Sequence, residues 1–301
     1  MGTKALTFVM QLNDIIPKYY YKETKMKICR SIDELQNWRK EQTKSIGFVP
    51  TMGALHHGHL SLMEHAKQKD ELLVVSIFVN PTQFLEGEDF DKYPKKEESD
   101  LAICERIGVD CLFLPNRDMM YEKDELSITA PKVRAFTLEG SSRPGHFDGV
   151  LQIVLKLFNL VQPQHAFFGK KDAQQLSMIQ HMVNRLFLPL EIVPVETVRE
   201  EGGLALSSRN VYLSKDERIN ALLLSKSLRH ASSMILSKVL DADRILEEMY
   251  TFFKDIKGVD VEYIAIVDRD FQLLKQVAVG NTIIALAVKV GTTRLIDNLW
   301  I

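Results

Sequence analysis

The chain has 301 residues, of which 46% are hydrophobic and 26% are charged, and its formal net charge is −2. This composition is typical of a globular protein long enough for two domains, and it excludes a disordered chain. The near-neutral charge supplies no overall field for a nucleic-acid backbone or an anionic membrane. We therefore expect a protein that acts on small molecules, with neither of those as a partner.

Cysteine content and apolar runs indicate the compartment. The chain has three cysteines, Cys29, Cys104 and Cys111. They form no Cys-x-x-Cys motif, and their odd number does not suit a framework of disulfides, so we expect buried thiols in a reducing environment. No apolar run approaches the roughly 20 residues of a membrane span, and Leu6–Met10 is too short for a secretory signal. We expect a cytoplasmic protein, and we interpret residues 1–25, which lack a sustained period, as an N-terminal extension without an assigned role.

From Ser31 to residue 198 the pattern alternates between strands and helices. Ser31 is a predicted N-cap of a short helix that continues through Trp38. Short apolar runs of strand length alternate with longer helical segments, which predicts a Rossmann-like, doubly wound parallel sheet. The predicted strands are Ile46–Val49, Leu72–Val79, Val109–Leu114, His165–Phe168 and Leu190–Val198, and the predicted helices are Glu97–Ile107, Val150–Val161 and Asp172–Leu186.

The pattern changes after Gly202-Gly203. A capping box at Ser214–Glu217 predicts a long amphipathic helix through about Ser232. Further on, the sequence predicts a helix and two strands, at Asp241–Phe253, Val261–Val267 and Thr282–Val290. We expect residues 26–198 to form the first domain and residues 199–301 a smaller α+β domain that closes over the active site.

A strand, a glycine-bearing turn and a helix start coincide at residues 46–66. Gly53 and Gly58 allow close backbone approach, and the first helical turn has N–H groups without intrahelical partners, so a polyphosphate can bind there. His56 and His59 are three residues apart and can donate to the same phosphate chain. They can also be ordinary helix-terminus residues or metal ligands. A third metal ligand at a recognisable spacing is missing, so phosphate binding is the favoured interpretation.

Three more clusters carry polar groups next to predicted strands or at the domain boundary. Each has an ordinary alternative. Phe168–Gln175 can be a solvated loop, Leu204–Asn210 a polar linker and Phe78–Phe84 a proline turn capped by Asn80. In the functional interpretation they supply a lysine for phosphate, hydroxyls with a guanidinium, and amides for a polar substrate. These clusters are Phe168–Gln175, Leu204–Asn210 and Phe78–Phe84.

Taken together, these segments resemble the pantothenate synthetase family, the ATP-dependent ligases that join pantoate to β-alanine. The resemblance covers about residues 26–301, and Pro50–Leu60 is similar to that family's version of the HIGH-type nucleotidyltransferase signature. The other matching segments are Phe78–Phe84, Gly145–Phe147, Phe168–Gln175, Leu206–Asn210 and Gly291–Asn298.

The resemblance implies a role for each matching residue. His59 corresponds to the family's assigned acid, and His56, Lys171, Ser207, Ser208 and Arg209 assist on the phosphates. Gln83 and Gln175 correspond to pantoate-binding positions, Gln83 also faces β-alanine, and Asn80 supports them. The residues expected around ATP are Met52, Gly53, Ala54, Leu55, His56, His57, Gly58, His59, Gly169, Lys170, Lys171, Asp172, Val198, Leu206, Ser207, Ser208 and Arg209.

The resemblance further implies a homodimer that uses ATP with Mg²⁺, without identifying protein ligands of the metal. The expected reaction joins D-pantoate to β-alanine through a pantoyl adenylate and releases AMP and pyrophosphate, a step in making the coenzyme A precursor pantothenate. Lys170, Leu85 and Gly202 depart from the family pattern, which affects loop details and affinity. A nucleotidyltransferase with a stable nucleotide-linked product and a nucleotide-sensing module are the alternatives. A dehydrogenase is disfavoured because no Gly-x-Gly-x-x-Gly follows a strand.

Overall fold

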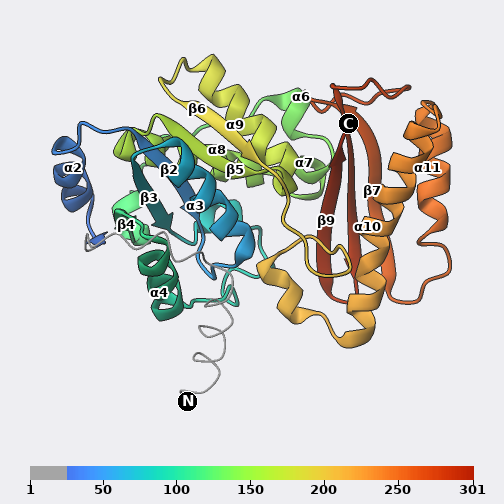
Figure 1. Cartoon of the computed structure of the whole chain (residues 1–301), viewed down its shortest axis with the longest axis horizontal. Coiled ribbons are helices and arrows are strands. Elements are labelled where there is room, and N and C mark those ends of the chain that lie inside the picture. The colour runs from blue at the N-terminus through green and yellow to red at the C-terminus, as the bar shows by residue number, and fades with distance from the viewer. Residues whose placement is uncertain (1–25) are drawn as a thin grey trace.

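A computed structural model describes residues 26–301, and the expected N-terminal extension, residues 1–25, lies outside the described residues. Figure 1 shows two sheets side by side, each covered by helices. Within residues 26–301, every helix is too short or too polar to cross a bilayer.

The first sheet has six strands in the order β1-β4-β3-β2-β5-β6, and all of its strand pairs are parallel. This arrangement confirms the predicted doubly wound sheet. Its adjacent residues Phe48 and Val49 are both fully buried but belong to different core clusters, so the sheet is covered on both faces. The strands are β1 (Lys27–Cys29), β2 (Ile46–Thr51), β3 (Leu72–Ile77), β4 (Cys111–Phe113), β5 (His165–Gly169) and β6 (Glu191–Val195).

Local signals in the sequence set the helices of this region. Ser31 caps the first helix through a capping box with Glu34, and the helix that ends at Ile107 is terminated by Gly108 with φ of 78°. The helices are α2 (Ile32–Lys40), α3 (His57–Lys69), α4 (Glu97–Ile107), α5 (Arg117–Met120), α6 (Lys132–Ala135), α7 (Glu139–Ser142), α8 (His146–Val161) and α9 (Ala173–Arg185), with short 3₁₀ turns η2 (Pro81–Gln83), η3 (Lys170–Asp172) and η4 (Ser208–Tyr212).

The second sheet is antiparallel, with the order β7-β8-β9, and has helices on one face (Figure 1). The predicted capping box at Ser214 is present, although its helix continues to Leu236 rather than ending near Ser232. The third strand, which pairs with β8 along its whole length, was not predicted from the periodicity. The elements are α10 (Lys215–Leu236), α11 (Ala242–Thr251), β7 (Val259–Asp268), β8 (Thr282–Val290) and β9 (Thr293–Trp300).

The order of the parallel strands determines where a ligand can bind. Strands β1, β4 and β3 lie on one side of β2, and β5 and β6 lie on the other. The chain connections therefore run in opposite directions from the junction between β2 and β5. In open α/β sheets the crevice at the carboxyl ends of such strands is the usual ligand site. The predicted motifs after β2, β3 and β5 all begin at this edge.

Candidate active site

The turn between β2 and α3 is held by buried hydrogen bonds. Gly53 and Ala54 have φ of 82° and 50°, and the Asp100 carboxylate accepts hydrogen bonds from the N–H groups of Ala54 (2.9 Å) and Leu55 (2.8 Å). A Cβ at position 53 would lie 3.0 Å from Asp100 Oδ2. Glycine at position 53 therefore permits both the left-handed conformation and the close approach of this carboxylate.

The two imidazoles cap the helix that they belong to. His56 is the N-cap of α3 and accepts from Gly58 N–H through Nδ1 (3.1 Å), while His59 Nδ1 accepts from His56 N–H (3.2 Å). Their ring centroids are 4.2 Å apart. Because Nδ1 is the acceptor in both rings, the proton of each neutral ring is on Nε2, which is the donor that remains for a ligand.

These capping bonds modify the predicted phosphate site. We expected free backbone N–H groups to bind the anion, but those of Ala54, Leu55, His56 and Gly58 already have partners within the protein. The donors available at this helix start are therefore chiefly the imidazole side chains.

Both histidines are neutral at neutral pH. Burial lowers the pKa of His56 to about 4 and that of His59 to about 3, and the positive charge of Lys171 shifts both in the same direction. A neutral imidazole stabilises developing negative charge by donating its N–H hydrogen bond. Without a bound anion, His59 is thus set as a hydrogen-bond donor rather than as a charged acid.

The lysine motif follows β5 as predicted, but its two lysines differ. Lys171 lines the same cavity as His56 and His59, whereas Lys170 is outside that lining and forms an ion pair with Glu196. The carbonyl groups of both lysines accept hydrogen bonds from Asn298 Nδ2, at 2.9 and 2.7 Å. Strand β9 thus fixes the backbone of the motif from 127 residues away.

Two ion pairs lie at the rim of the site. Arg143 forms a bidentate pair with Glu88 (2.6 and 2.7 Å), and Arg209 forms one with Asp89 (3.0 and 2.8 Å). We call these four residues the ion-paired rim. Burial raises the pKa of Asp89, but its hydrogen bonds to Arg209 outweigh burial, so the pKa is lowered overall and the carboxylate stays ionised.

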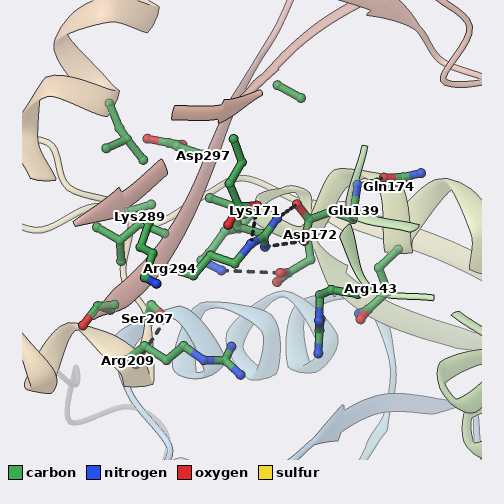
Figure 2. A pocket seen from close by; sticks show the side chains of 18 of the residues that line it. Glu139, Arg143, Lys171, Asp172, Gln174, Ser207, Arg209, Lys289, Arg294 and Asp297 are labelled. Carbon is green, nitrogen blue, oxygen red and sulfur yellow. Dashed lines mark hydrogen bonds and ion pairs between the residues drawn. The ribbon is translucent and has the colours of Figure 1, made fainter. Parts of the chain in front are cut away.

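Two connected cavities occupy the space between the sheets. One, of about 260 Å³, is lined by the histidines, and the other, of about 660 Å³, extends toward the second sheet. Figure 2 shows Lys171, Arg209 and Arg294 around the larger one, where Arg294 is paired with Glu139. The cavities share Lys171, Ser207 and Arg209, so together they provide room for a nucleotide and a small acid.

Most of the predicted residues meet in the cavity that contains the histidines. The structure brings together the histidines, the lysine motif, the Ser207–Arg209 segment and the amides. Gly53, Ala54, Leu55, His57 and Lys170 do not line this cavity; Gly53 to Leu55 shape the turn behind it. The lining includes Met52, His56, Gly58, His59, Asn80, Gln83, Gly169, Lys171, Asp172, Gln175, Val198, Leu206, Ser207, Ser208 and Arg209.

The sequence patterns assign no role to several supporting residues. Asp100 and Asn298 act on site backbone from distant elements, and Glu88 and Asp89 lie in a loop that showed no distinguishing pattern. Asp100 is a buried charge on the helix α4, 2% exposed, and a carboxylate at a core-facing helical position is a signal that could have identified it.

Comparison with known proteins identifies the family. The model of the family described as pantoate-beta-alanine ligase matches residues 27–300. The pantothenate synthetase of Sulfurimonas denitrificans is 52% identical over 276 residues, which cover 92% of this chain and 100% of that protein. The pantothenate synthetase of Helicobacter acinonychis is 46% identical over 281 residues, with 92% and 100% covered.

Solved structures agree with this family match. The crystal structure of pantothenate synthetase from Thermus thermophilus has a TM-score of 0.87 at 39% identity, covering 91% of this chain and 99% of that one. The pantoate-beta-alanine ligase from Francisella tularensis, described as complexed with beta-gamma ATP and beta-alanine, has a TM-score of 0.76 at 35% identity, covering 92% and 98%. By its sequence motifs, its fold and these relatives, the chain belongs to the pantoate–β-alanine ligase family, that is, the pantothenate synthetases.

Proposed function

We propose that this protein joins D-pantoate to β-alanine in the cavity at the carboxyl ends of β2 and β5, with a pantoyl adenylate as the intermediate. The observation that carries the proposal is that His56, His59 and Lys171 share one cavity with the amides of Gln83 and Gln175. Side chains that can donate hydrogen bonds to phosphate are therefore adjacent to neutral amides that can bind a small polar acid, as activation of a carboxylate by ATP requires.

In the first step, a carboxylate oxygen of pantoate attacks the α-phosphorus of ATP. The new P–O bond forms as the bond to the bridging oxygen breaks, and pyrophosphate leaves with that electron pair. His56 and His59 donate from Nε2 to the phosphate oxygens, while Lys171, Ser207, Ser208 and Arg209 bind the remaining charge. Polyphosphate charge next to His59 raises the pKa of its imidazole again, so the family's expected acid role requires bound ATP.

In the second step, the neutral amine of β-alanine attacks the acyl carbon of the adenylate. The C–N bond forms, AMP leaves with the electrons of the broken C–O bond, and the amine proton is lost to solvent. No covalent bond to the protein is needed, since the mixed anhydride already makes AMP a good leaving group. The contribution of the protein is positioning and charge stabilisation.

We also propose that Mg²⁺ accompanies the nucleotide. Among residues 26–301, no group of three or more His, Cys, Asp or Glu side chains is arranged to hold a metal ion. This fits Mg²⁺, which is usually held by substrate phosphates and one or two carboxylates. Asp172 lines both cavities and is the carboxylate that would contact it, and the ion would supply additional charge neutralisation on the phosphates.

Three further proposals concern organisation. Residues 26–198 and 199–301 act as two domains, supported by a core cluster built wholly from residues after 203, and the second domain closes over the nucleotide. The protein works as a homodimer, and it works in the cytoplasm; we base both proposals on the resemblance to the family.

The test is incubation with ATP, Mg²⁺, D-pantoate and β-alanine, followed by mass analysis. We expect AMP and pantothenate in equal amounts, and pyrophosphate release when β-alanine is omitted. A product that retains the nucleotidyl group would instead identify a nucleotidyltransferase. ATP binding without pyrophosphate release on addition of pantoate would identify a sensing module.

A further inference from the structure

The side-chain amide of Asn80 has one orientation that its surroundings permit. Asn80 is 1% exposed, and its Nδ2 lies 3.1 Å from the carbonyl oxygen of Gly149 and 3.1 Å from Gln83 Oε1. A backbone carbonyl can only accept a hydrogen bond, so the NH₂ end of Asn80 must face Gly149. The other N–H of this group then donates to Gln83 Oε1.

This orientation sets that of Gln83 in turn. Because Oε1 of Gln83 is occupied by Asn80, its Nε2 faces the cavity, where it lies 3.0 Å from Met52 Sδ. A thioether sulfur is a weak acceptor, so a substrate oxygen can replace it. Gln83 thus presents N–H groups rather than its carbonyl to the ligand.

The opposite end of the Asn80 amide is held by two hydroxyl groups from outside the cavity lining. The Tyr121 hydroxyl donates to Asn80 Oδ1 at 2.6 Å, and Thr82 Oγ1 lies 3.1 Å from the same oxygen. Thr82 and Tyr121 are also within 3.1 Å of each other. The Tyr121 ring is fixed by Lys156 Nζ, 4.7 Å from its centroid.

Helix α8 lies close enough for the Gly149 carbonyl to accept the Asn80 hydrogen bond only because residue 149 is glycine. A Cβ there would lie 2.3 Å from the carbonyl oxygen of Thr82, well inside van der Waals contact. The acceptor for Asn80 and the hydroxyls that oppose it thus come from separate segments packed on the η2 turn.

We propose that Tyr121 is a positioning residue for the acid substrate, which acts through Asn80 to present Gln83 Nε2 to an acceptor oxygen of that substrate. The inference rests on the proposed function, in which Gln83 binds pantoate. A reversed Gln83 amide would place its carbonyl against the carboxylate or hydroxyl oxygens of the acid, so loss of this orientation weakens binding of the acid and spares ATP.

The test compares Tyr121→Phe, Thr82→Val and the double variant by steady-state kinetics, varying pantoate and ATP separately. Tyr121→Phe should raise the KM for pantoate about fivefold, as expected for one lost hydrogen bond, with the KM for ATP unchanged. The double variant leaves buried Asn80 Oδ1 without either hydroxyl, and its KM for pantoate should rise by about tenfold or more. Tyr250→Phe, at an exposed tyrosine on α11, is the matched control and should change neither KM.

Kinetic and thermal measurements on these variants and on Gln83→Ala separate the possible failures. Equal rises in both KM values, or a fall in melting temperature that accounts for the loss, would mean that Tyr121 is merely structural and would overturn the proposal. An unchanged KM for pantoate in the double variant would overturn it as well. Gln83→Ala tests the underlying function: if it too leaves the KM for pantoate unchanged, then the proposed binding of pantoate by Gln83 fails as well, whereas a rise shows that only the role of Tyr121 fails.

Discussion

The two sides of the active site are held together by different kinds of interaction. The histidine turn, residues 52–59, is fixed by backbone hydrogen bonds to buried Asp100 and by its own imidazole caps. The ion-paired rim is instead held by two bidentate arginine–carboxylate pairs whose side chains are 15–33% exposed. One side is fixed before a ligand arrives, and the other is held by contacts that a ligand anion can replace.

This difference assigns different tasks to the two sides. A transition state is stabilised best by donors that need no rearrangement, and in the proposed mechanism the histidine turn supplies them. The arginines of the rim already have anionic partners, so in that mechanism a polyphosphate has to compete with Asp89 for Arg209. We expect substitutions in the turn to change rates, and substitutions in the rim to change the affinity for ATP.

Removal of a side chain that donates to the phosphates should have the largest effect. His59→Ala or Lys171→Ala should slow pyrophosphate release about 10²–10³-fold at saturating substrates, the usual loss for one preorganised donor. Single-turnover release from ATP and pantoate is the measurement. His65→Ala, at an exposed histidine of α3, is the matched control. A His59→Ala variant with the parent rate would show that the fixed side does not carry catalysis.

Asp100 should connect stability with rate. Asp100→Ala leaves the N–H groups of Ala54 and Leu55 buried without this acceptor, which should lower the free energy of unfolding by about 2–4 kcal/mol. Displacement of the turn should also lower kcat by about tenfold. Denaturant unfolding and steady-state kinetics measure the two effects, with exposed Asp118→Ala as the control. A stability loss without a rate loss would separate the scaffold from the chemistry.

The histidine turn should also make stability depend on pH. The unfolded chain binds protons on these imidazoles near pH 6.5, whereas the folded chain holds them neutral until about pH 4 for His56 and 3 for His59. Stability should therefore fall as the pH drops below about 6.5, by at most about 1.4 kcal/mol per pH unit for each imidazole. In His59→Gln that decline should be shallower, by about 1.6 kcal/mol between pH 6.5 and 5 in denaturant unfolding. Equal declines in the two proteins would contradict the burial of His59 as a neutral group.

The smallest expected effect belongs to the rim. Asp89→Asn should lower the KM for ATP about two- to fivefold, because the triphosphate no longer competes with a charged partner for Arg209. Initial rates at varied ATP measure it, and Asp91→Asn, at an exposed position of the same loop, is the control. A rise in KM would mean that Asp89 belongs to the fixed scaffold, which would remove the distinction between the two sides.

Local signals made much of the fold predictable. The N-cap at Ser31, the capping box at Ser214, the helix stop at Gly108 and the apolar runs of β2 and β3 are properties of short segments, and each is present as expected. The sequence pattern does not predict strand β9. Its residues alternate in burial over Thr293–Leu295 but include the buried polar pair Asp297 and Asn298, which mask a strand pattern.

Contacts between distant segments account for the rest. The histidine, lysine and Ser207–Arg209 motifs were recognisable because each lies on one continuous stretch beside a strand. Asp100, Tyr121 and Asn298 form hydrogen bonds to residues of the site across 45, 41 and 127 residues, and no local period encodes such pairings. The carboxylates opposite Arg143 and Arg209 were hidden for the same reason.

The amide of Asn298 connects the two sheets mechanically. It donates hydrogen bonds to the peptide carbonyls of Lys170 and Lys171, while its own strand, β9, belongs to the antiparallel sheet. If the second domain closes over the nucleotide as proposed, the backbone of Lys170 and Lys171 must move with that sheet, and closure would bring the Lys171 ammonium group to the nucleotide in the same motion.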